Sequence, residues 1–322
     1  MNDKTKKPQL KSISIRDFLK QEFPPRQMLL DPIIATQSLT MIYSWRGLGK
    51  TNLALGMSLA ISTGCKFLHW SAPKPKRVLY VDGEMPANLM QQRIKKLVRA
   101  NGAEPPETHF RLVTPDLQDG QMPDLSKKDG QGALENVLSQ GYELVVLDNL
   151  STLCRTGNEN EAESWGPLQE WLLSLRRKDF AVVALHHAGK GGTQRGTSRR
   201  EDALDTVIKL VRPHDYDLRD GARFQLIFEK ARRLFGAEME PIEVSIREAG
   251  EDVQWLCGRA IDENTRRVAE LHNGGLTQRE IAKERQIGVG TVNRHVARAR
   301  EAGLLEDDTP DSEIEAAEAE DI

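Results

Sequence analysis

A short loop ending in a lysine and a threonine is the segment best suited to chemistry. Residues 44–51 read Ser-Trp-Arg-Gly-Leu-Gly-Lys-Thr, between an apolar run at 39–43 and a helical-looking stretch at 52–61. In such a loop, backbone N–H groups and the helix N-terminus bind phosphates, the lysine reaches the β- and γ-phosphate oxygens, and the hydroxyl holds Mg²⁺. We therefore expect a site for ATP and Mg²⁺ built from Ser44, Arg46, Gly47, Leu48, Gly49, Lys50, Thr51 and Asn52.

The first position of this loop departs from the usual pattern. It is normally glycine and is Ser44 here, whereas Gly47 and Gly49 keep the loop conformationally permissive. A chance Gly-Lys-Thr in a surface turn is the competing interpretation of the loop alone. The departure at Ser44 bears on nucleotide affinity rather than on the chemistry.

Apolar strands alternate with amphipathic helices from Ser38 to about Leu210. Strands that are apolar on both faces indicate a mostly parallel sheet covered by helices. The predicted strands are 77–82, 143–147 and 180–185, and the predicted helices are 86–100 and 162–178. Further strands extend the sheet after Thr206, at 207–210, 224–228, 242–246 and 253–256, and residues 101–130 are expected to form a long surface connection.

The predicted strands end in side chains suited to nucleotide chemistry. In an open parallel sheet, ligands bind at the carboxyl ends of the strands. There Glu84 can polarise an attacking water, Asp148 can hold Mg²⁺ through its water shell, and a histidine of the pair His186-His187 can sense the γ-phosphate. Singly, each is equally a helix cap or a structural group. Their convergence after a Gly-Lys-Thr loop favours nucleotide hydrolysis.

The order of these motifs resembles that of the RecA-like ATPases. The motifs are Gly-Lys-Thr, Tyr-Val-Asp-Gly-Glu-Met, Leu-Val-Val-Leu-Asp-Asn-Leu-Ser, His-His-Ala-Gly-Lys-Gly-Gly and Arg-Gly-Thr-Ser-Arg-Arg-Glu-Asp. Over roughly residues 38–248 the chain is most similar to plasmid replicative helicases of the RepA type, which act as hexameric rings on single-stranded DNA.

The resemblance implies a role for each matching residue. It makes Lys50 the phosphate ligand, Thr51 and Asp148 the Mg²⁺ ligands, Glu84 the catalytic carboxylate and His187 the γ-phosphate sensor. His187 is preferred to His186 because it is nearer the following loop.

A glycine-rich basic segment follows the histidines. Residues 189–200 contain the candidate DNA ligands Lys190, Arg195, Arg199 and Arg200, which suit a loop that tracks a phosphodiester backbone. The segment has no aromatic residue, so we expect backbone contacts rather than base stacking. A solvated basic loop without DNA contact is the alternative.

A second group of cations ends the predicted strand at 224–228. In ring ATPases a Lys-x-Arg at such a place reaches the γ-phosphate of the neighbouring subunit, and Lys230 and Arg232 are the candidates for this catalytic role. A surface salt-bridge cluster is the alternative.

The C-terminal segment resembles the helix-turn-helix modules of transcription regulators. Thr277 and Glu280 form a capping-box pattern, and Gln286 stands where the turn usually has glycine, so we expect a strained turn. The second helix offers Thr291, Asn293, Arg294 and Arg298 to duplex DNA. Three-helix packing without DNA contact is the alternative, and Glu301 with the acidic tail argues against tight binding.

Composition limits the class of protein. The chain has 322 residues, 39% of them hydrophobic and 29% charged, and no apolar stretch approaches the roughly 20 residues that span a bilayer. We expect a cytoplasmic protein without membrane contact, in which Cys65, Cys154 and Cys257 are ordinary buried thiols. The expected division is an N-terminal segment (1–37), a RecA-like core (38–257), a helix-turn-helix module (258–305) and a disordered acidic tail (306–322).

The sequence thus predicts an α/β fold. It comprises a RecA-like P-loop NTPase core, a mostly parallel sheet covered by helices and extended by β-strands, plus a small all-α helix-turn-helix domain. The expected function is that of a DNA-dependent ATPase, a ring-forming replicative helicase of a plasmid or other mobile element. A nucleotide-switched DNA-binding regulator, or a partition-type ATPase without unwinding activity, is the second hypothesis.

Overall fold

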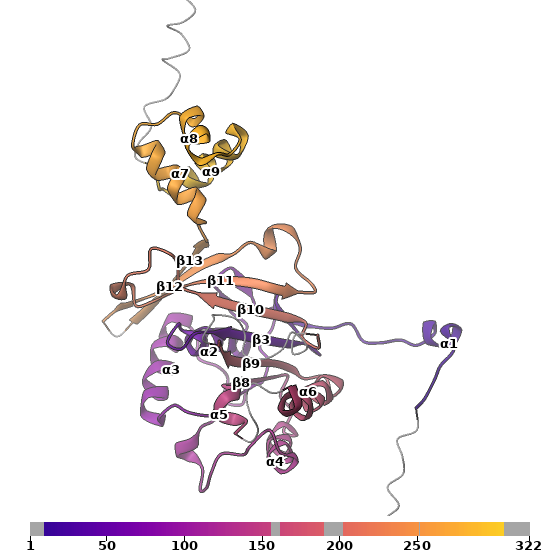
Figure 1. The fold of residues 1–322 in the computed structure, drawn as a ribbon. Helices are drawn as coiled ribbons and strands as arrows, with labels where there is room; N and C mark the ends of the chain where they lie inside the picture. The colour runs from indigo at the N-terminus through magenta and orange to yellow at the C-terminus, as the bar shows by residue number, and fades with distance from the viewer. Residues whose placement is uncertain (1–9, 156–161, 190–201, 251, 306–322) are drawn as a thin grey trace, which may run out of the picture.

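The core of the molecule is a nine-stranded sheet in the order β13-β12-β11-β10-β3-β9-β8-β6-β7 (Figure 1). The computed structural model describes residues 10–155, 162–189, 202–250 and 252–305. The parallel part consists of β3 (Leu39–Ser44), β6 (Val78–Asp82), β7 (Phe110–Val113), β8 (Leu144–Asp148), β9 (Ala181–His187) and β10 (Thr206–Val211). The antiparallel extension is β11 (Ala222–Ala231), β12 (Ile242–Ala249) and β13 (Asp252–Arg259).

Helices cover the parallel strands on both faces. Every residue of β3, β6 and β8 is buried, as the double-sided apolar pattern predicts. One face packs against α2 (Lys50–Thr63) and α3 (Ala87–Asn101), and the other packs against α4 (Lys128–Leu138), α5 (Leu150–Leu153) and α6 (Ala162–Arg177) (Figure 1). The mostly parallel, helix-covered sheet that the sequence predicts is confirmed.

Two small hairpins add to the face that carries α2. They are β1 (Met28–Leu30) with β2 (Ile34–Ala35), and β4 (Lys66–Phe67) with β5 (Trp70–Ser71). Leu29, Leu30, Phe67 and Trp70 join the same hydrophobic cluster as the helix. Residues 53–62 of α2 are consequently buried on all sides.

The expectation of a plain surface connection at residues 101–130 was wrong. This stretch contains β7, which forms the outer edge of the sheet beside β6, and a 3₁₀ turn at Pro115–Leu117. An edge strand is buried on fewer sides, and none of the four residues of β7 is fully buried. The strand is only four residues long, Phe-Arg-Leu-Val, which makes it easy to overlook within a polar stretch.

The C-terminal unit is a bundle of three helices. They are α7 (Glu263–Asn273), α8 (Gln278–Arg285) and α9 (Val289–Glu301), and they lie beyond β13 at one end of the molecule (Figure 1). Their own small core contains Val268, Ile281, Val292 and Val296. The helix-turn-helix unit that the sequence predicts is therefore a separately cored part of the chain.

Three remaining features of the fold bear on the sequence expectations. A short helix, α1 (Ile15–Leu19), lies away from the body on an extended segment (Figure 1). Within the described residues, no helix combines the length and apolarity needed to cross a membrane. The expectation of three buried thiols was wrong, because Cys65 and Cys154 are half-buried and Cys257 is exposed on the outermost strand, β13.

Candidate functional site

Four strand ends meet at one edge of the sheet. Because β3 and β9 are paired in parallel, Ser44 at the start of the loop lies opposite His187. Asp82 and Asp148 lie opposite each other on the neighbouring pair β6 and β8. The carboxyl ends of β6, β8 and β9, which are distant in sequence, therefore lie around the N-terminus of α2, which follows β3. This is the arrangement that the strand pattern predicts.

Lys50 is the centre of this cluster. It is only 6% exposed, and its Nζ donates to the Ser44 hydroxyl at 3.0 Å and to the Ser44 and Trp45 carbonyls at 3.3 Å each. The fourth contact is with His187, whose Nδ1 lies 3.3 Å away. Four contacts hold the ammonium group at the mouth of the loop.

The charge of Lys50 is costly to hold in this environment. Burial lowers the pKa of Lys50 to about 8, and the carboxylates of Asp148 and Glu84 partly oppose that shift. A buried cation is held best when an anion is close. The site therefore favours a negatively charged ligand, such as a phosphate group, next to Lys50.

Ser44 takes part in the loop rather than interrupting it. Its side chain is buried, accepts from Lys50 and donates to the Trp45 carbonyl at 2.7 Å. A glycine is required at the other end of the loop, at Gly49, by its backbone conformation and by a close neighbour. Gly49 has a φ of +97°, and a Cβ there would lie 3.0 Å from the Phe224 ring.

Asp148 lies deep in the site. Its Oδ2 accepts from the Tyr80 hydroxyl at 2.7 Å, and the Thr51 side chain also bonds to it. Burial raises the pKa of Asp148, and these hydrogen bonds act in the opposite direction. A buried carboxylate beside a threonine hydroxyl is a donor set that suits Mg²⁺.

Asp82 belongs to the site, although the sequence analysis assigned it no function. It is 1% exposed; Oδ2 accepts from the Met85 backbone N–H at 2.9 Å, and Oδ1 has no hydrogen-bond partner among the residues that the structure describes. Burial raises the pKa of Asp82 to about 6, with Asp148 adding to the effect. Only the sheet register shows that two buried carboxyl groups lie side by side.

The two histidines and Glu84 occupy different environments. His187 is half-buried beside Lys50, whereas His186 is fully buried on the same strand. Because successive residues of a strand point to opposite faces, only one histidine can face the lysine. Glu84 is exposed, and it is close enough to Lys50 and Asp148 to affect the pKa of both.

Lys230 and Arg232 lie far from Lys50 of the same chain. Ala231 is paired with Thr206, which lies opposite Thr40 at the start of β3, whereas the phosphate loop follows the end of that strand. Lys230 Nζ and Arg232 Nη2 both donate to the Asp202 carbonyl, at 3.4 and 3.0 Å. The structure therefore does not bring these cations into the site of their own chain.

The predicted DNA ligands of the core lie outside the described residues. These are Lys190, Arg195, Arg199 and Arg200. The acidic tail at 306–322 also lies outside the described residues.

Helix α8 begins with the capping box that the sequence predicts. The Thr277 side chain accepts from the Glu280 N–H at 3.4 Å, and the Glu280 carboxylate accepts from the Thr277 N–H at 2.8 Å. Gln286 adopts the left-handed conformation with a φ of 54°, which a side chain disfavours, so the strained turn is confirmed.

The second helix of this unit presents polar side chains. On α9, Asn293 and Arg294 are exposed and Thr291 is half-buried. Arg294 Nη2 donates to the Thr291 hydroxyl at 3.1 Å.

Both the core and the C-terminal unit match models of known protein families. A family model described as an AAA domain matches residues 4–193, which is more than half of the 322 residues. The chain belongs to the AAA domain family. A second model, described as a winged helix-turn-helix DNA-binding unit, matches residues 271–306. The chain is thus a P-loop ATPase with a C-terminal helix-turn-helix, as the motifs predict.

Two solved structures are similar to this AAA protein. One is the RadB recombinase, with 20% identity, a TM-score of 0.47, and coverage of 69% of this chain and 91% of that one. The other is a KaiC-like protein from the hyperthermophilic archaeon Pyrococcus horikoshii OT3, with 13% identity, a TM-score of 0.47, and coverage of 71% and 93%.

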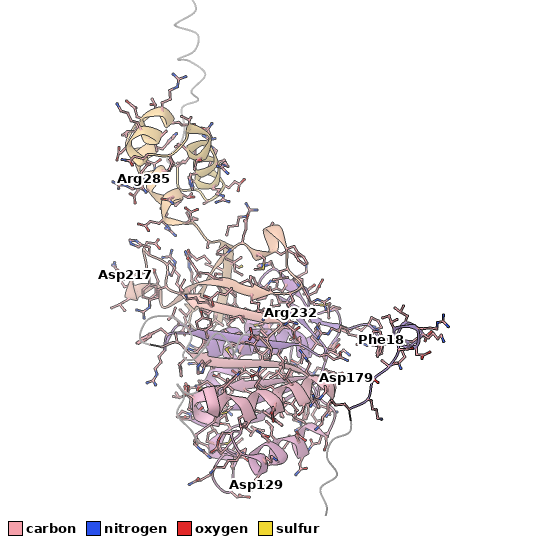
Figure 2. The ribbon with its side chains drawn as sticks, turned by 45° about the vertical axis from the view of Figure 1, so that its right-hand side comes forward. Phe18, Asp129, Asp179, Asp217, Arg232 and Arg285 are labelled. Atoms are coloured by element: carbon pink, nitrogen blue, oxygen red, sulfur yellow. The ribbon has the colours of Figure 1, made fainter. Side chains whose placement is uncertain are left out.

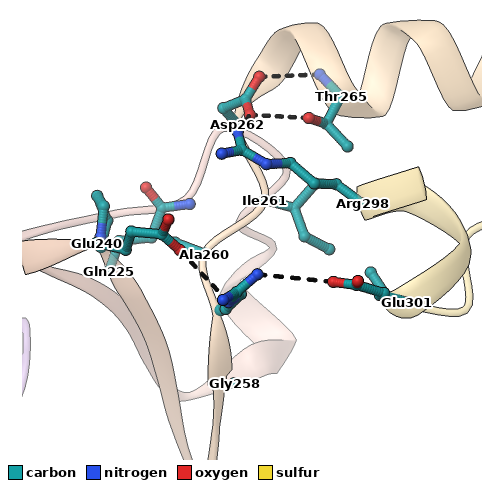
Figure 3. Close-up of a pocket in the computed structure, with 12 residues that line it drawn as sticks. Gln225, Glu240, Gly258, Ala260, Ile261, Asp262, Thr265, Arg298 and Glu301 are labelled. Atoms are coloured by element: carbon teal, nitrogen blue, oxygen red, sulfur yellow. Dashed lines mark hydrogen bonds and ion pairs between the residues drawn. The ribbon is translucent and has the colours of Figure 1, made fainter. Parts of the chain in front are cut away.

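A cavity of about 530 Å³ lies where the AAA core meets the helix-turn-helix unit (Figure 3). Arg259 of β13 pairs with Glu240 at 3.4 Å and with Glu301 of α9 at 3.6 Å. Arg298, which the sequence analysis offered to a DNA groove, lines this cavity and lies 3.6 Å from Asp262. Asp262 caps α7 within the same helix-turn-helix unit, and the side chain of Arg298 is 54% exposed, so its role as a DNA ligand stays a prediction.

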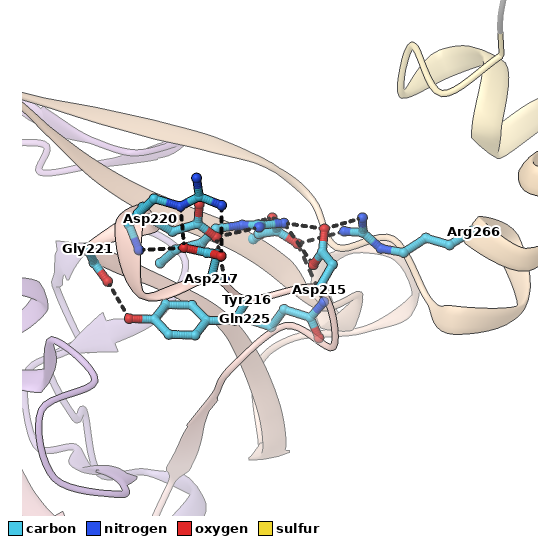
Figure 4. A network of polar contacts seen from close by, with 10 residues as sticks. Asp215, Tyr216, Asp217, Asp220, Gly221, Gln225 and Arg266 are labelled. Atoms are coloured by element: carbon cyan, nitrogen blue, oxygen red, sulfur yellow. Dashed lines mark hydrogen bonds and ion pairs between the residues drawn. The ribbon is translucent and has the colours of Figure 1, made fainter.

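A second set of ion pairs joins the AAA core to α7 (Figure 4). Arg266 of α7 reaches Asp215 at 2.6 Å and Glu243 at 3.5 Å. Arg223 of β11 shares both carboxylates, at 3.0 and 2.6 Å. Both arginines are mostly buried, so these pairs are less screened than exposed ones.

Proposed function

We propose that this chain is a DNA-dependent ATPase that assembles as a hexameric ring, in the manner of RepA-type replicative helicases, and moves on single-stranded DNA. The cluster of Lys50, His187, Asp148 and Glu84 around the phosphate loop is the observation that carries the proposal. The helix-turn-helix match adds a second, duplex-binding contact, for which Thr291, Asn293 and Arg294 are the candidates.

Each residue of the site has a proposed role. Lys50 binds the β- and γ-phosphates, and the N–H groups of residues 46–52 bind the remaining phosphate oxygens. Glu84 is exposed and close to Lys50, which suits a base that orients and deprotonates the attacking water. His187 touches Lys50 and precedes the basic segment, so a change in its contact can be transmitted to DNA-binding residues.

The donor set fits Mg²⁺. Thr51 and Asp148 would hold the ion, and the buried Asp82 beside them adds negative charge. Bound there, Mg²⁺ supplies positive charge to the β- and γ-phosphate oxygens of ATP.

The proposal requires a cation from a neighbouring subunit. Lys230 and Arg232 lie at the opposite edge of the sheet from Lys50, so they can act only on the nucleotide of another copy. Their placement supports a head-to-tail assembly, in which one edge of each subunit faces the phosphate loop of the next.

The test is the response of ATP hydrolysis to DNA. Single-stranded DNA is expected to stimulate turnover more than duplex DNA of equal length and salt concentration. A forked duplex is expected to be unwound with ATP and not with a non-hydrolysable analogue. Hydrolysis without a DNA effect and without strand separation would contradict the helicase assignment and leave the ATPase.

A nucleotide-switched DNA regulator is the second candidate. The ion pairs of Arg266 favour it, because they link the helix-turn-helix to the 212–221 connection that follows β10 near the phosphate loop. In such a switch, ATP changes the affinity for duplex DNA, and Arg266→Ala removes that change. If the chain is a helicase without this coupling, ATP leaves the affinity for duplex DNA unchanged in the wild type and in the Arg266→Ala variant alike.

A further inference from the structure

The segment before β1 carries the largest apolar exposure of the described chain. Leu10 is 97% exposed, Ile15 72%, Leu19 76% and Phe23 61%. We call residues 10–27, which include α1, the arm. Such a run of exposed apolar side chains in one segment marks a surface that another surface covers.

Between Leu10 and Pro25, the arm makes few contacts with the rest of the described chain. Ser14 caps α1, Lys20 pairs with Asp17 at 3.2 Å, and the rings of Phe18 and Phe23 lie 5.4 Å apart. All these contacts are inside the arm. In both views the arm extends away from the body (Figures 1 and 2).

The base of the arm lies beside the cations that the catalytic site needs. Arg26 pairs with Asp205 at 3.6 Å, and Asp205 also accepts from the backbone N–H of Leu39, the first residue of β3, at 3.0 Å. The Asp205 carbonyl accepts from the Arg232 N–H at 3.0 Å. Figure 2 shows Arg232 at the end of the sheet from which the arm leaves.

The opposite edge of the sheet carries an open apolar hollow. A cavity of about 420 Å³ lies at the phosphate loop and is lined by Tyr43, Trp45, Leu48, Leu210, Val211 and Arg212. Trp45 is 49% exposed in the loop itself. The space suits one or two large apolar side chains.

We propose that the arm of one copy of this chain docks in the phosphate-loop hollow of the next copy. The partner is a second copy because the arm and Arg232 leave the same edge, and the hollow and Lys50 lie at the other edge. One head-to-tail contact therefore brings the arm to the hollow and Arg232 towards the neighbour's Lys50. If its non-helical part is extended, the arm reaches roughly 30 Å from Arg26 to Ile15 at the start of α1 and roughly 45 Å to Leu10. The inference rests on the proposed ring assembly and names the surface that forms it.

The first test removes the apolar face of the arm. The double variant Ile15→Asp, Leu19→Asp is expected to raise the dissociation constant of assembly roughly 100-fold or more, because two apolar contacts are lost. Sedimentation with a non-hydrolysable ATP analogue measures it. Leu89→Asp, at a 50% exposed leucine of α3, is the matched control and is expected to assemble like the wild type. Assembly of the arm variant at wild-type concentrations would overturn the proposal.

The second test locates the partner surface without altering the phosphate loop. A photo-crosslinking amino acid, p-benzoylphenylalanine, replaces Phe18, and the protein is mixed with an isotopically labelled copy. Crosslinks between labelled and unlabelled chains are expected at residues 43–48 and 210–212. Crosslinks only within one chain, or only to other surfaces, would overturn the proposal.

The two proposals fail in different ways. If the wild type assembles through the arm but hydrolyses no ATP, the proposed function fails and the docking stands. If it hydrolyses ATP with DNA stimulation as a monomer at all concentrations, the docking fails and the ATPase stands.

Discussion

Nζ of Lys50 lies 3.3 Å from Nδ1 of His187, although 137 residues separate them in the chain. The parallel pairing of β3 with β9 produces this contact, because it sets Ser44 opposite His187 and α2 begins at Lys50. The lysine predicted to bind phosphate thus touches the strand that leads into the basic segment. Under the proposed function, exchange of the histidine contact for a phosphate contact is expected to link nucleotide occupancy to the segment predicted to bind DNA.

Replacing Lys50 with alanine is expected to abolish hydrolysis while the fold persists. The change removes the cation at the β- and γ-phosphates, and losing one such group costs roughly 10²–10³ in turnover. Turnover of purified protein and its thermal unfolding midpoint are the measurements. Lys74→Ala, at an exposed lysine, is the control. Wild-type turnover in the Lys50 variant would show that the phosphate-loop assignment is wrong.

Replacing Glu84 with glutamine is expected to preserve ATP binding and lower turnover by roughly 10²–10⁴, since an amide cannot accept the proton of the attacking water. Glu84 is exposed, so the change removes no buried contact. A fluorescent ATP analogue measures binding, and phosphate release measures turnover. Normal turnover would place the catalytic carboxylate elsewhere.

The basic segment is tested by salt dependence. Replacing Arg195, Arg199 and Arg200 with alanine is expected to weaken single-strand binding and to flatten the plot of log affinity against log salt. Each lost phosphate contact lowers the slope by about 0.7, so the triple variant loses about 2. An unchanged slope would remove this segment from the path of the DNA.

Mixing two inactive variants tests the cation from the neighbouring subunit. Arg232→Ala is expected to lower turnover by roughly 10³–10⁵, and Lys50→Ala is inactive for its own reason. In mixed assemblies, some interfaces join an intact Lys50 to an intact Arg232, so a fraction of activity returns. Turnover per site of the wild type is also expected to fall on dilution. Full turnover of a dilute monomer, with no effect of mixing, would exclude the arrangement.

The buried Asp82 predicts a dependence of stability on pH. Because the folded-state pKa is about 6 and the ordinary value is 3.8, the folded protein holds a proton that the unfolded chain releases between these values. The associated stabilisation is present below about pH 4 and is lost as the pH rises through 6. Asp82→Asn avoids the buried charge. The free energy of unfolding of this variant is therefore expected to exceed that of the wild type by about 2–3 kcal/mol at pH 8. Urea unfolding at pH 4 and pH 8 measures it, and a less stable variant at pH 8 would contradict it.

The local sequence determined the elements and much of the chemistry. Apolar runs marked the buried strands, because burial on both faces demands them, and Gly49, Lys50 and Thr51 marked the phosphate loop. Thr277 and Glu280 marked the start of α8, because a cap depends on neighbours in the chain. The edge strand β7 escaped this reasoning, since its four residues lie within a longer stretch rich in proline, aspartate and glycine.

The tertiary structure alone decided which of these residues meet. Strand order and register depend on pairings between distant segments, so only the folded sheet sets Asp82 beside Asp148 and brings His187 into contact with Lys50. The same pairings carry Arg232 to the edge opposite the phosphate loop, and packing of α9 against α7 brings Arg298 within 3.6 Å of Asp262. No local pattern contains that information, because the residues concerned lie tens of positions apart or more.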